Sequence, residues 1–264
     1  MRRPPWTPAS RRRVTVERPH RLCLRRSVRL QLRVRRHRHA GPRQRRRGSL
    51  LPGEGPRPRV QDEPALHQDR VQLRLPARSV ANSIPFSSAK MSDILSLLSV
   101  EPHSEKAAAI EKTLHRCEEP AVAGETSLCA TSLESMVDFT TASLGSRDLA
   151  ALSTEVSKAD SPKQTYVIVP SGVQKLAGGK AVACHAQSYA YAVFYCHATR
   201  ATKSYVVSLV GKDGTQVEAV VVCHTDTSSW NPKHIAFQLL KVSPGTAPVC
   251  HFLPQDHVVW TRRT

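Results

Sequence analysis

Four of the seven cysteines in this chain are followed immediately by a histidine, and this repeated Cys-His couplet restricts the fold more than any other feature. The couplets occupy positions 184–185, 196–197, 223–224 and 250–251. Adjacent residues of a β-strand point to opposite faces of the sheet. If the couplets lie on strands, we therefore expect their cysteines on one face and their histidines on the other.

The two sets of side chains favour different chemistry. An even number of cysteines in one domain is typical of a disulfide framework, so we expect three bridges, with Cys117–Cys129 as the local pair. Imidazoles gathered from distant segments are natural ligands for copper or zinc, whereas single histidines at the surface or in hydrogen bonds are the simpler alternative. A zinc finger needs closely spaced cysteines such as C-x2-C, and the sequence has none. The six cysteines beyond residue 80 are Cys117, Cys129, Cys184, Cys196, Cys223 and Cys250.

The positive charge lies entirely in the first part of the chain. Residues 1–80 contain 23 Arg, no Lys and five acidic residues, a formal charge of +18, whereas the remainder has 16 basic and 16 acidic residues. This proline-rich part shows no helical or strand period, which predicts a disordered cationic arm. Nucleic-acid binding through the arm is the least favoured function class, although such an arm would bind phosphate in a salt-dependent way.

Arginine without lysine is also typical of GC-rich DNA translated in the wrong frame. We interpret residues 1–79 as an out-of-frame segment and residues 80–261 as the folded domain. The sequence as written begins with no apolar stretch of the kind a signal peptide requires, and it contains no run of 18 apolar residues that would predict a membrane span.

Sequence patterns beyond residue 80 predict helices first and strands afterwards. Ser104 is positioned to cap a helix, and Thr131 with Glu134 fits a capping box for a second helix that ends at Gly145. Val- and Tyr-rich segments predict strands, and the sequence KDG at 212–214 predicts a hairpin turn. The predicted strands are 165–169, 190–198, 204–210 and 217–224. The fold class is therefore α+β: N-terminal helices, then a mainly antiparallel β-sheet, stapled by disulfides.

The couplet spacing resembles the signature of the plant BURP domain. Ten, 25 and 25 residues separate successive couplets, and the surrounding sequence agrees in CEEPAVAGETSLCATSLESMVDF, YAYAVFYCH, CHTDTSSWNPKHIAFQLL and PGTAPVCHFLPQDHVVW. The resemblance is to the dehydration-responsive type. The family domain opens with a Phe-Phe pair that this chain lacks, so we expect the domain to be truncated at its N-terminus. A neighbouring reading frame of 50–69 can supply the missing opening, FFLEKD.

The resemblance implies a secreted protein of the cell wall or apoplast, associated with stress or development. We expect it to be non-catalytic and to bind copper, with cell-wall components or proteins as partners. The alternative is a copper-dependent autocatalytic cyclase that crosslinks Tyr or Trp side chains of a core peptide. Family resemblance implies four metal ligands, His185, His197, His224 and His251. His234 and His257 are second-choice ligands, whereas Asp226 and Trp230 are expected to serve in turns or packing.

Overall fold

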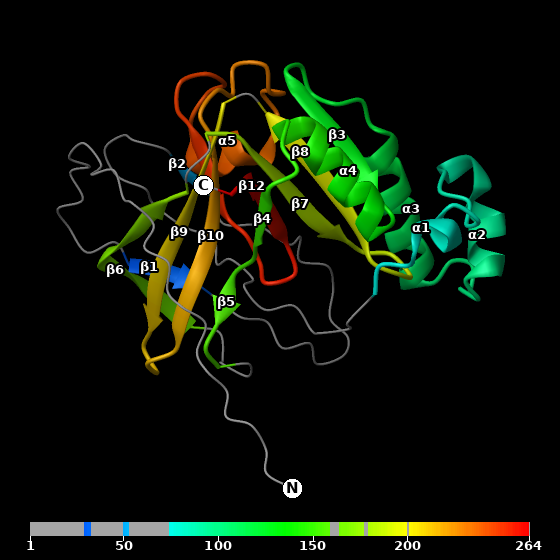
Figure 1. Cartoon of the computed structure of the whole chain (residues 1–264), viewed down its shortest axis with the longest axis horizontal. Coiled ribbons are helices and arrows are strands. Elements are labelled where there is room, and N and C mark those ends of the chain that lie inside the picture. The colour runs from blue at the N-terminus through cyan, green and yellow to red at the C-terminus, as the bar shows by residue number, and fades with distance from the viewer. Residues whose placement is uncertain are drawn as a thin grey trace, which may run out of the picture.

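The computed structural model describes residues 29–32, 50–52, 74–158, 164–176, 179–199 and 201–263, with side chains described from residue 74 onward (Figure 1). Of residues 1–73, it describes two short strands, which pair with strands of the folded domain. The rest of the predicted arm lies outside the described residues, and its out-of-frame origin stays a prediction. The two strands are β1 (Arg29–Leu32) and β2 (Leu50–Pro52).

The helices lie mainly before the strands along the chain, as predicted. Ser104 caps the longest helix, where its hydroxyl accepts a hydrogen bond from the Ala107 amide at 3.1 Å. The helical elements are α1 (Arg78–Ala81), a 3-10 turn (Ser88–Lys90), α2 (Met91–Leu97), α3 (Glu105–Glu118), α4 (Leu133–Leu144) and α5 (Ile235–Leu240).

The capping box of α4 begins one residue later than predicted. The amide of Ser135 donates to Ser132 Oγ at 3.1 Å, and the amide of Ser132 donates to Ser135 Oγ at 3.2 Å. Two serines three positions apart thus satisfy both amides, and the predicted pair of Thr131 and Glu134 does not serve as the box. Gly145 ends the helix in the left-handed conformation, with φ 61°, as the sequence predicts.

The strands form two sheets, and every pairing among the described residues is antiparallel. The larger sheet runs β1, β6 (Gln164–Lys175), β9 (Thr202–Gly211), β10 (Gln216–His224), β11 (Val249–Phe252) and β2, with β5 (Glu155–Val156) also beside β10. The smaller sheet runs β3 (Glu125–Ala130), β8 (Val193–Thr199), β7 (Ala181–Gln187), β12 (Val258–Arg262) and β4 (Leu149–Leu152).

The fold class is therefore confirmed, with differences in detail. The predicted strands at 165–169, 190–198, 204–210 and 217–224 correspond to β6, β8, β9 and β10. A turn at 212–214 joins β9 to β10, and Gly214 adopts φ 78° there. The strands divide into two sheets instead of one. Strand β7, which carries the first couplet, lies outside the predicted strands, and β3 lies between α3 and α4.

The two sheets pack against each other through small and branched apolar side chains. Ala183 on β7, Val222 on β10 and Val259 on β12 belong to one buried cluster, which Leu253 completes from the loop after β11. Each of these residues exposes 2% of its surface or less, so water is excluded from this interface. The packing fixes β7 and β10 relative to each other. His185 on β7 and His224 at the end of β10 lie two residues after Ala183 and Val222, and therefore on the same faces.

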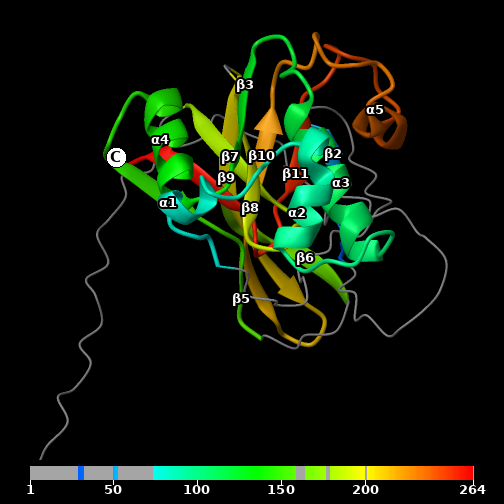
Figure 2. The same cartoon turned by 90° about the vertical axis from the view of Figure 1, so that its right-hand side faces the viewer.

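Helix α4 covers one face of the smaller sheet, and the opposite face is shared between the larger sheet and the helices α2 and α3. Met136 and Leu144 of α4 pack on one face beside Cys184 and Cys196. The helices α2 and α3 pack on the other side, against Val193 and the residues near it. Figure 2 shows α4 and α3 on opposite sides of β7 and β8. No helix among the described residues has the length and apolar character needed to cross a bilayer.

Candidate metal centre

Three disulfides hold the region that carries the couplets. Cys184 lies directly opposite Cys196 on β7 and β8, and the two are bonded. The second couplet bridge joins β10 to β11 at opposed positions. The local bridge joins α3 to β3, as predicted. All six cysteines beyond residue 80 are therefore paired, as Cys117–Cys129, Cys184–Cys196 and Cys223–Cys250.

Strand alternation turns the four couplet histidines away from their cysteines. Each couplet lies at two adjacent positions of one strand, so the histidine side chain points to the opposite face of the sheet from the cysteine side chain. The cysteines contribute to apolar clusters on the outer faces of the two sheets. The histidines project from the facing surfaces of the sheets: His185 from β7, His197 from β8, His224 from β10 and His251 from β11.

The four imidazole rings form a closed circuit between the sheets. Ring centroids are 5.2 Å apart for His185 and His197, and 5.5 Å apart for His197 and His224. The circuit closes through His251, whose ring centroid lies 5.7 Å from that of His224 and 5.5 Å from that of His185. Four segments spread over 67 residues of sequence thus bring four imidazoles together.

Two contacts between ring nitrogens occur within this cluster. His185 Nε2 lies 3.1 Å from His197 Nε2, and His185 Nδ1 lies 3.0 Å from His257 Nδ1. Both separations are within hydrogen-bonding range. Because a neutral imidazole carries one N–H and one bare nitrogen, each contact pairs one donor with one acceptor.

Only one of the two second-choice histidines lies in the cluster. His257 joins the cluster, with its ring centroid 4.9 Å from that of His185. His234 lies outside it: Trp230 stands between His234 and His224, and His234 Nδ1 accepts a hydrogen bond from the Ala236 amide at the start of α5. Sequence reasoning alone did not rank these two residues.

Asp226 and Trp230 have the structural roles that the sequence favoured. Asp226 Oδ1 accepts hydrogen bonds from the amide of Ser228 at 3.0 Å and from its hydroxyl at 2.6 Å. This is a side-chain-stabilised turn of the kind that aspartate commonly makes. Trp230 packs against His224 and against Phe237 of α5.

A carboxylate that sequence reasoning missed adjoins the cluster. Glu125 Oε2 on β3 lies 3.4 Å from His197 Nδ1, a long charge-assisted contact, and Nδ1 has no closer partner among the described residues. Tyr195 donates its hydroxyl hydrogen to Glu125 Oε1 at 3.1 Å, and the Arg116 guanidinium lies 4.3 Å from the centre of the Tyr195 ring. Tyr195 stands two positions before His197, so alternation could have placed it on the same face.

Burial keeps most of these histidines neutral. Removal from water, with smaller effects from neighbouring imidazoles, lowers the pKa of His185 and His224 well below 6.5. The same causes lower the pKa of His251 to about 4 and that of His257 to about 3. Neutral imidazoles retain the lone pairs that a metal ion requires.

Glu125 is held in its ionised form. Burial raises the pKa of its carboxyl group, but hydrogen bonding and charge interaction with His197 and the Tyr195 hydrogen bond outweigh burial, so the pKa is lowered. The side chain is 8% exposed. A partly buried carboxylate therefore faces the outer nitrogen of one cluster histidine.

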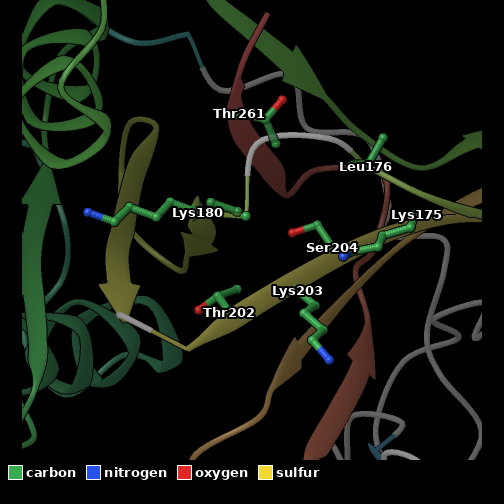
Figure 3. A pocket seen from close by; sticks show the side chains of 9 residues that line it. Lys175, Leu176, Lys180, Thr202, Lys203, Ser204 and Thr261 are labelled. Carbon is green, nitrogen blue, oxygen red and sulfur yellow. The ribbon is translucent and has the colours of Figure 1, made fainter. Parts of the chain in front are cut away.

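A depression lies beside β9, where Thr202 and Lys203 pair with His224 and Cys223 of β10. Lysines and hydroxyl groups line it, among them Lys180, Lys203 and Ser204 (Figure 3). Figure 3 shows Lys180 and Lys203 pointing away from each other, so their charges do not converge on one point. We assign no site to this depression.

Comparison with known proteins identifies the family. The family model described as the BURP domain matches residues 61–262. The match begins before residue 80, where the sequence interpretation placed the start of the domain.

Curated relatives come from several plants. The chain is 60% identical over 189 residues to BURP domain-containing protein 3 of Oryza sativa subsp. japonica, which covers 70% of this chain and 44% of that protein. It is 52% identical over 183 residues to BURP domain protein RD22 of Arabidopsis thaliana, covering 69% of this chain and 47% of that protein. It is 42% identical over 187 residues to Protein RAFTIN 1B of Triticum aestivum, covering 70% of this chain and 51% of that protein.

The chain spans about half the length of these curated relatives. The family model nevertheless matches more than half of the chain, including all four couplets. The family expected from the couplet spacing is confirmed, and the chain belongs to the BURP domain family of plant proteins.

Proposed function

We propose that this chain is a secreted protein of the plant cell wall or apoplast, associated with stress or development, whose BURP domain binds copper(II) without turnover. The proposed ligands are His185, His197, His224 and His251. The closed circuit of their four rings is the observation that carries the proposal.

The Nε2 atoms of His185 and His197 are spaced as two ligands of one ion would be. Nitrogen ligands lie about 2.0–2.1 Å from a zinc-sized ion, so two neighbouring ligands lie roughly 2.9–3.4 Å apart. The observed separation of 3.1 Å falls within that range. The spacing of these two Nε2 atoms therefore already suits one bound ion.

The other two rings must approach the pair for binding. No three or more His, Cys, Asp or Glu side chains in the described part of the chain are grouped so as to hold a metal ion as they stand. His224 Nδ1 is buried and has no hydrogen-bond partner within the described part of the chain. A buried nitrogen without a partner carries a free-energy cost, and a bound ion would offset it. Small rotations of His224 and His251 are therefore a requirement of the proposal.

Copper(II) is the metal that this donor set favours. Affinity for divalent first-row ions peaks at copper, and nitrogen-rich tetragonal sites suit copper(II). The disulfides leave none of the six domain cysteines as a competing thiolate. When bound, copper(II) supplies a Lewis acid that can also accept one electron.

Three disulfides in one domain also support the extracellular assignment. Such bridges persist in oxidising compartments and are rare in the reducing cytosol. Wall components or other wall proteins are the partners that we expect in that setting.

Copper titration of the full chain by calorimetry tests the proposal. His197→Ala and His224→Ala remove one ligand from each sheet and should weaken binding by more than the roughly 10–100-fold typical of losing an outer partner. His115→Ala is the matched control, because that imidazole is 63% exposed on α3 and lies outside the cluster. Unchanged affinity in both cluster variants would rule out this site.

One observation favours the catalytic alternative, a copper-dependent peptide cyclase. The side chains of His197 and His257 are 11% and 14% exposed, so the cluster has an edge that a Tyr- or Trp-bearing segment could reach. Intact-mass measurement after incubation with copper(II) and oxygen separates the two functions. Our proposal predicts an unchanged mass, whereas each crosslink would remove two hydrogen atoms from the chain.

A further inference from the structure

We infer that the outer edge of β11 is a docking site for an extended peptide segment of a partner polypeptide, and that a segment docked there lies directly beside the histidine cluster. In this chain the position is taken by β2, a strand of three residues that pairs with β11. Docking itself requires no metal ion, and only its consequence for copper rests on the proposed function.

The main-chain groups of Cys250 point outward, away from β10. Consecutive residues of an antiparallel strand direct their N–H and C=O groups alternately toward one neighbouring strand and the other. The Leu253 amide donates to the Val220 carbonyl at 2.9 Å, so His251, two residues earlier, also faces β10. The Cα atom of Cys250 lies 3.9 Å from that of Cys223, the close approach of an opposed pair without mutual hydrogen bonds. Cys250 therefore presents its N–H and C=O to the strand that lies beyond β11.

Strand β2 meets this edge with few main-chain groups. Leu51 lies opposite Cys250, and Pro52 lies opposite Val249. Proline has no N–H and is tolerated at a sheet edge where none is needed. Leu51 and Cys250 are thus the pair that exchanges hydrogen bonds. Because so short a strand contributes little pairing of its own, a longer strand from a partner can displace it.

Main-chain pairing places few demands on the sequence of the docked strand. The other outer edge of the larger sheet, at β6, carries β1 with the sequence RLQL, whereas β11 carries β2 with the sequence LLP. A row of outward N–H and C=O groups is a template for another strand, and many proteins bind extended peptides by adding them to a sheet edge in this way. The partner segment is therefore recognised first as an extended strand.

A docked strand places one side chain beside the histidines. Directly opposed residues of an antiparallel pair have side chains on the same face, with Cβ atoms about 4.5–5.5 Å apart. The side chain opposite His251 therefore lies on the face from which the His251 imidazole projects. The side chain opposite Val249 lies on that face as well, where Val249 packs with Phe237 of α5 in an apolar cluster. An apolar residue is expected at this second position.

Hydrogen exchange of the Cys250 amide in the full chain, followed by NMR, tests the docking site. Leu51→Pro removes the N–H that pairs with Cys250 and should speed exchange of the Cys250 amide about tenfold, the factor that one hydrogen bond is worth. Leu51→Ala keeps the N–H and is the matched control. The His251 amide, which faces β10, should stay protected in both variants and shows that the fold is intact.

A synthetic peptide of residues 46–55 provides the partner strand. Added to the Leu51→Pro chain, it should restore protection of the Cys250 amide, whereas the same peptide N-methylated at Leu51 should not. An unprotected Cys250 amide in the unmodified chain, or a Leu51→Pro chain that the peptide fails to protect, would overturn the inference.

Copper provides the second readout. With copper(II) bound, the peptide carrying Leu50→Tyr should show paramagnetic broadening of its tyrosine ring signals, because that residue lies opposite His251. Protection of the Cys250 amide without broadening would overturn the placement beside the cluster. If the unmodified chain binds no copper, the proposed function falls, and amide exchange alone decides whether β11 docks a strand.

Discussion

His185 Nε2 lies 3.1 Å from His197 Nε2, on the face of the smaller sheet opposite the disulfide that joins Cys184 to Cys196. The couplet therefore combines two functions at adjacent positions. Its cysteine crosslinks neighbouring strands on the outer face, and its histidine faces the opposite sheet. The same arrangement recurs on β10 and β11, where the bridge is Cys223–Cys250.

Buried neutral histidines should make the stability of the domain depend on pH. An unfolded histidine binds a proton below about pH 6.5, whereas folded His251 binds one only near pH 4. The unfolded state thus binds more protons as the pH falls, so stability is complete above about pH 6.5 and decreases from there toward pH 4. His251 alone contributes a loss of about 3 kcal/mol at most.

Urea unfolding at pH 7 and at pH 4.5 measures this dependence. His251→Gln should reduce the difference between the two pH values, because glutamine does not titrate. Equal stability at both pH values in the unmodified chain would contradict the burial of neutral imidazoles.

Loss of the local disulfide should destabilise the domain without disturbing the histidines directly. Cys117 and Cys129 are 12 residues apart, so opening the loop should cost about 3 kcal/mol. Denaturant unfolding of the Cys117→Ala, Cys129→Ala double variant gives the free energy. Alkylation before reduction provides the companion test: none of the six domain cysteines should react, and modification of all six would refute the disulfide framework.

Packing between the two sheets should hold the histidine pairs together. Leu253 is 1% exposed and lies in the cluster between the sheets, so Leu253→Ala should cost about 2–5 kcal/mol in the free energy of unfolding. Ile235→Ala is the control, because Ile235 is 43% exposed and should change stability by less than about 0.5 kcal/mol. A Leu253→Ala variant as stable as the control would show that this cluster does not join the sheets.

The opposed faces of cysteine and histidine could be predicted from sequence because strand alternation is a local rule. The convergence of His185 and His197 with His224 and His251 could not be derived in that way, since it depends on how two sheets pack. The ligand set came instead from the family resemblance. The cap of α4 moved by one residue because Ser132 and Ser135 satisfy the same rule as the predicted Thr131 and Glu134.

Glu125 and His257 show what local patterns leave out. The strand that carries Glu125 lies between two helices and was not predicted, so no face could be assigned to its side chain. His257 and His234 both follow couplets in sequence, and only the packing of the loop before β12 distinguishes them. Whether each of these side chains lies beside the histidine cluster depends on tertiary packing, which local sequence patterns do not predict.

Pulsed electron paramagnetic resonance of the full chain loaded with copper(II) tests the central claim most directly, because it detects the remote nitrogen of each coordinated imidazole. The account predicts couplings from several imidazoles and a reduced number in each of His185→Ala, His197→Ala, His224→Ala and His251→Ala. A spectrum of hydrated copper, or one that none of the four substitutions alters, would contradict a copper site built from the couplet histidines.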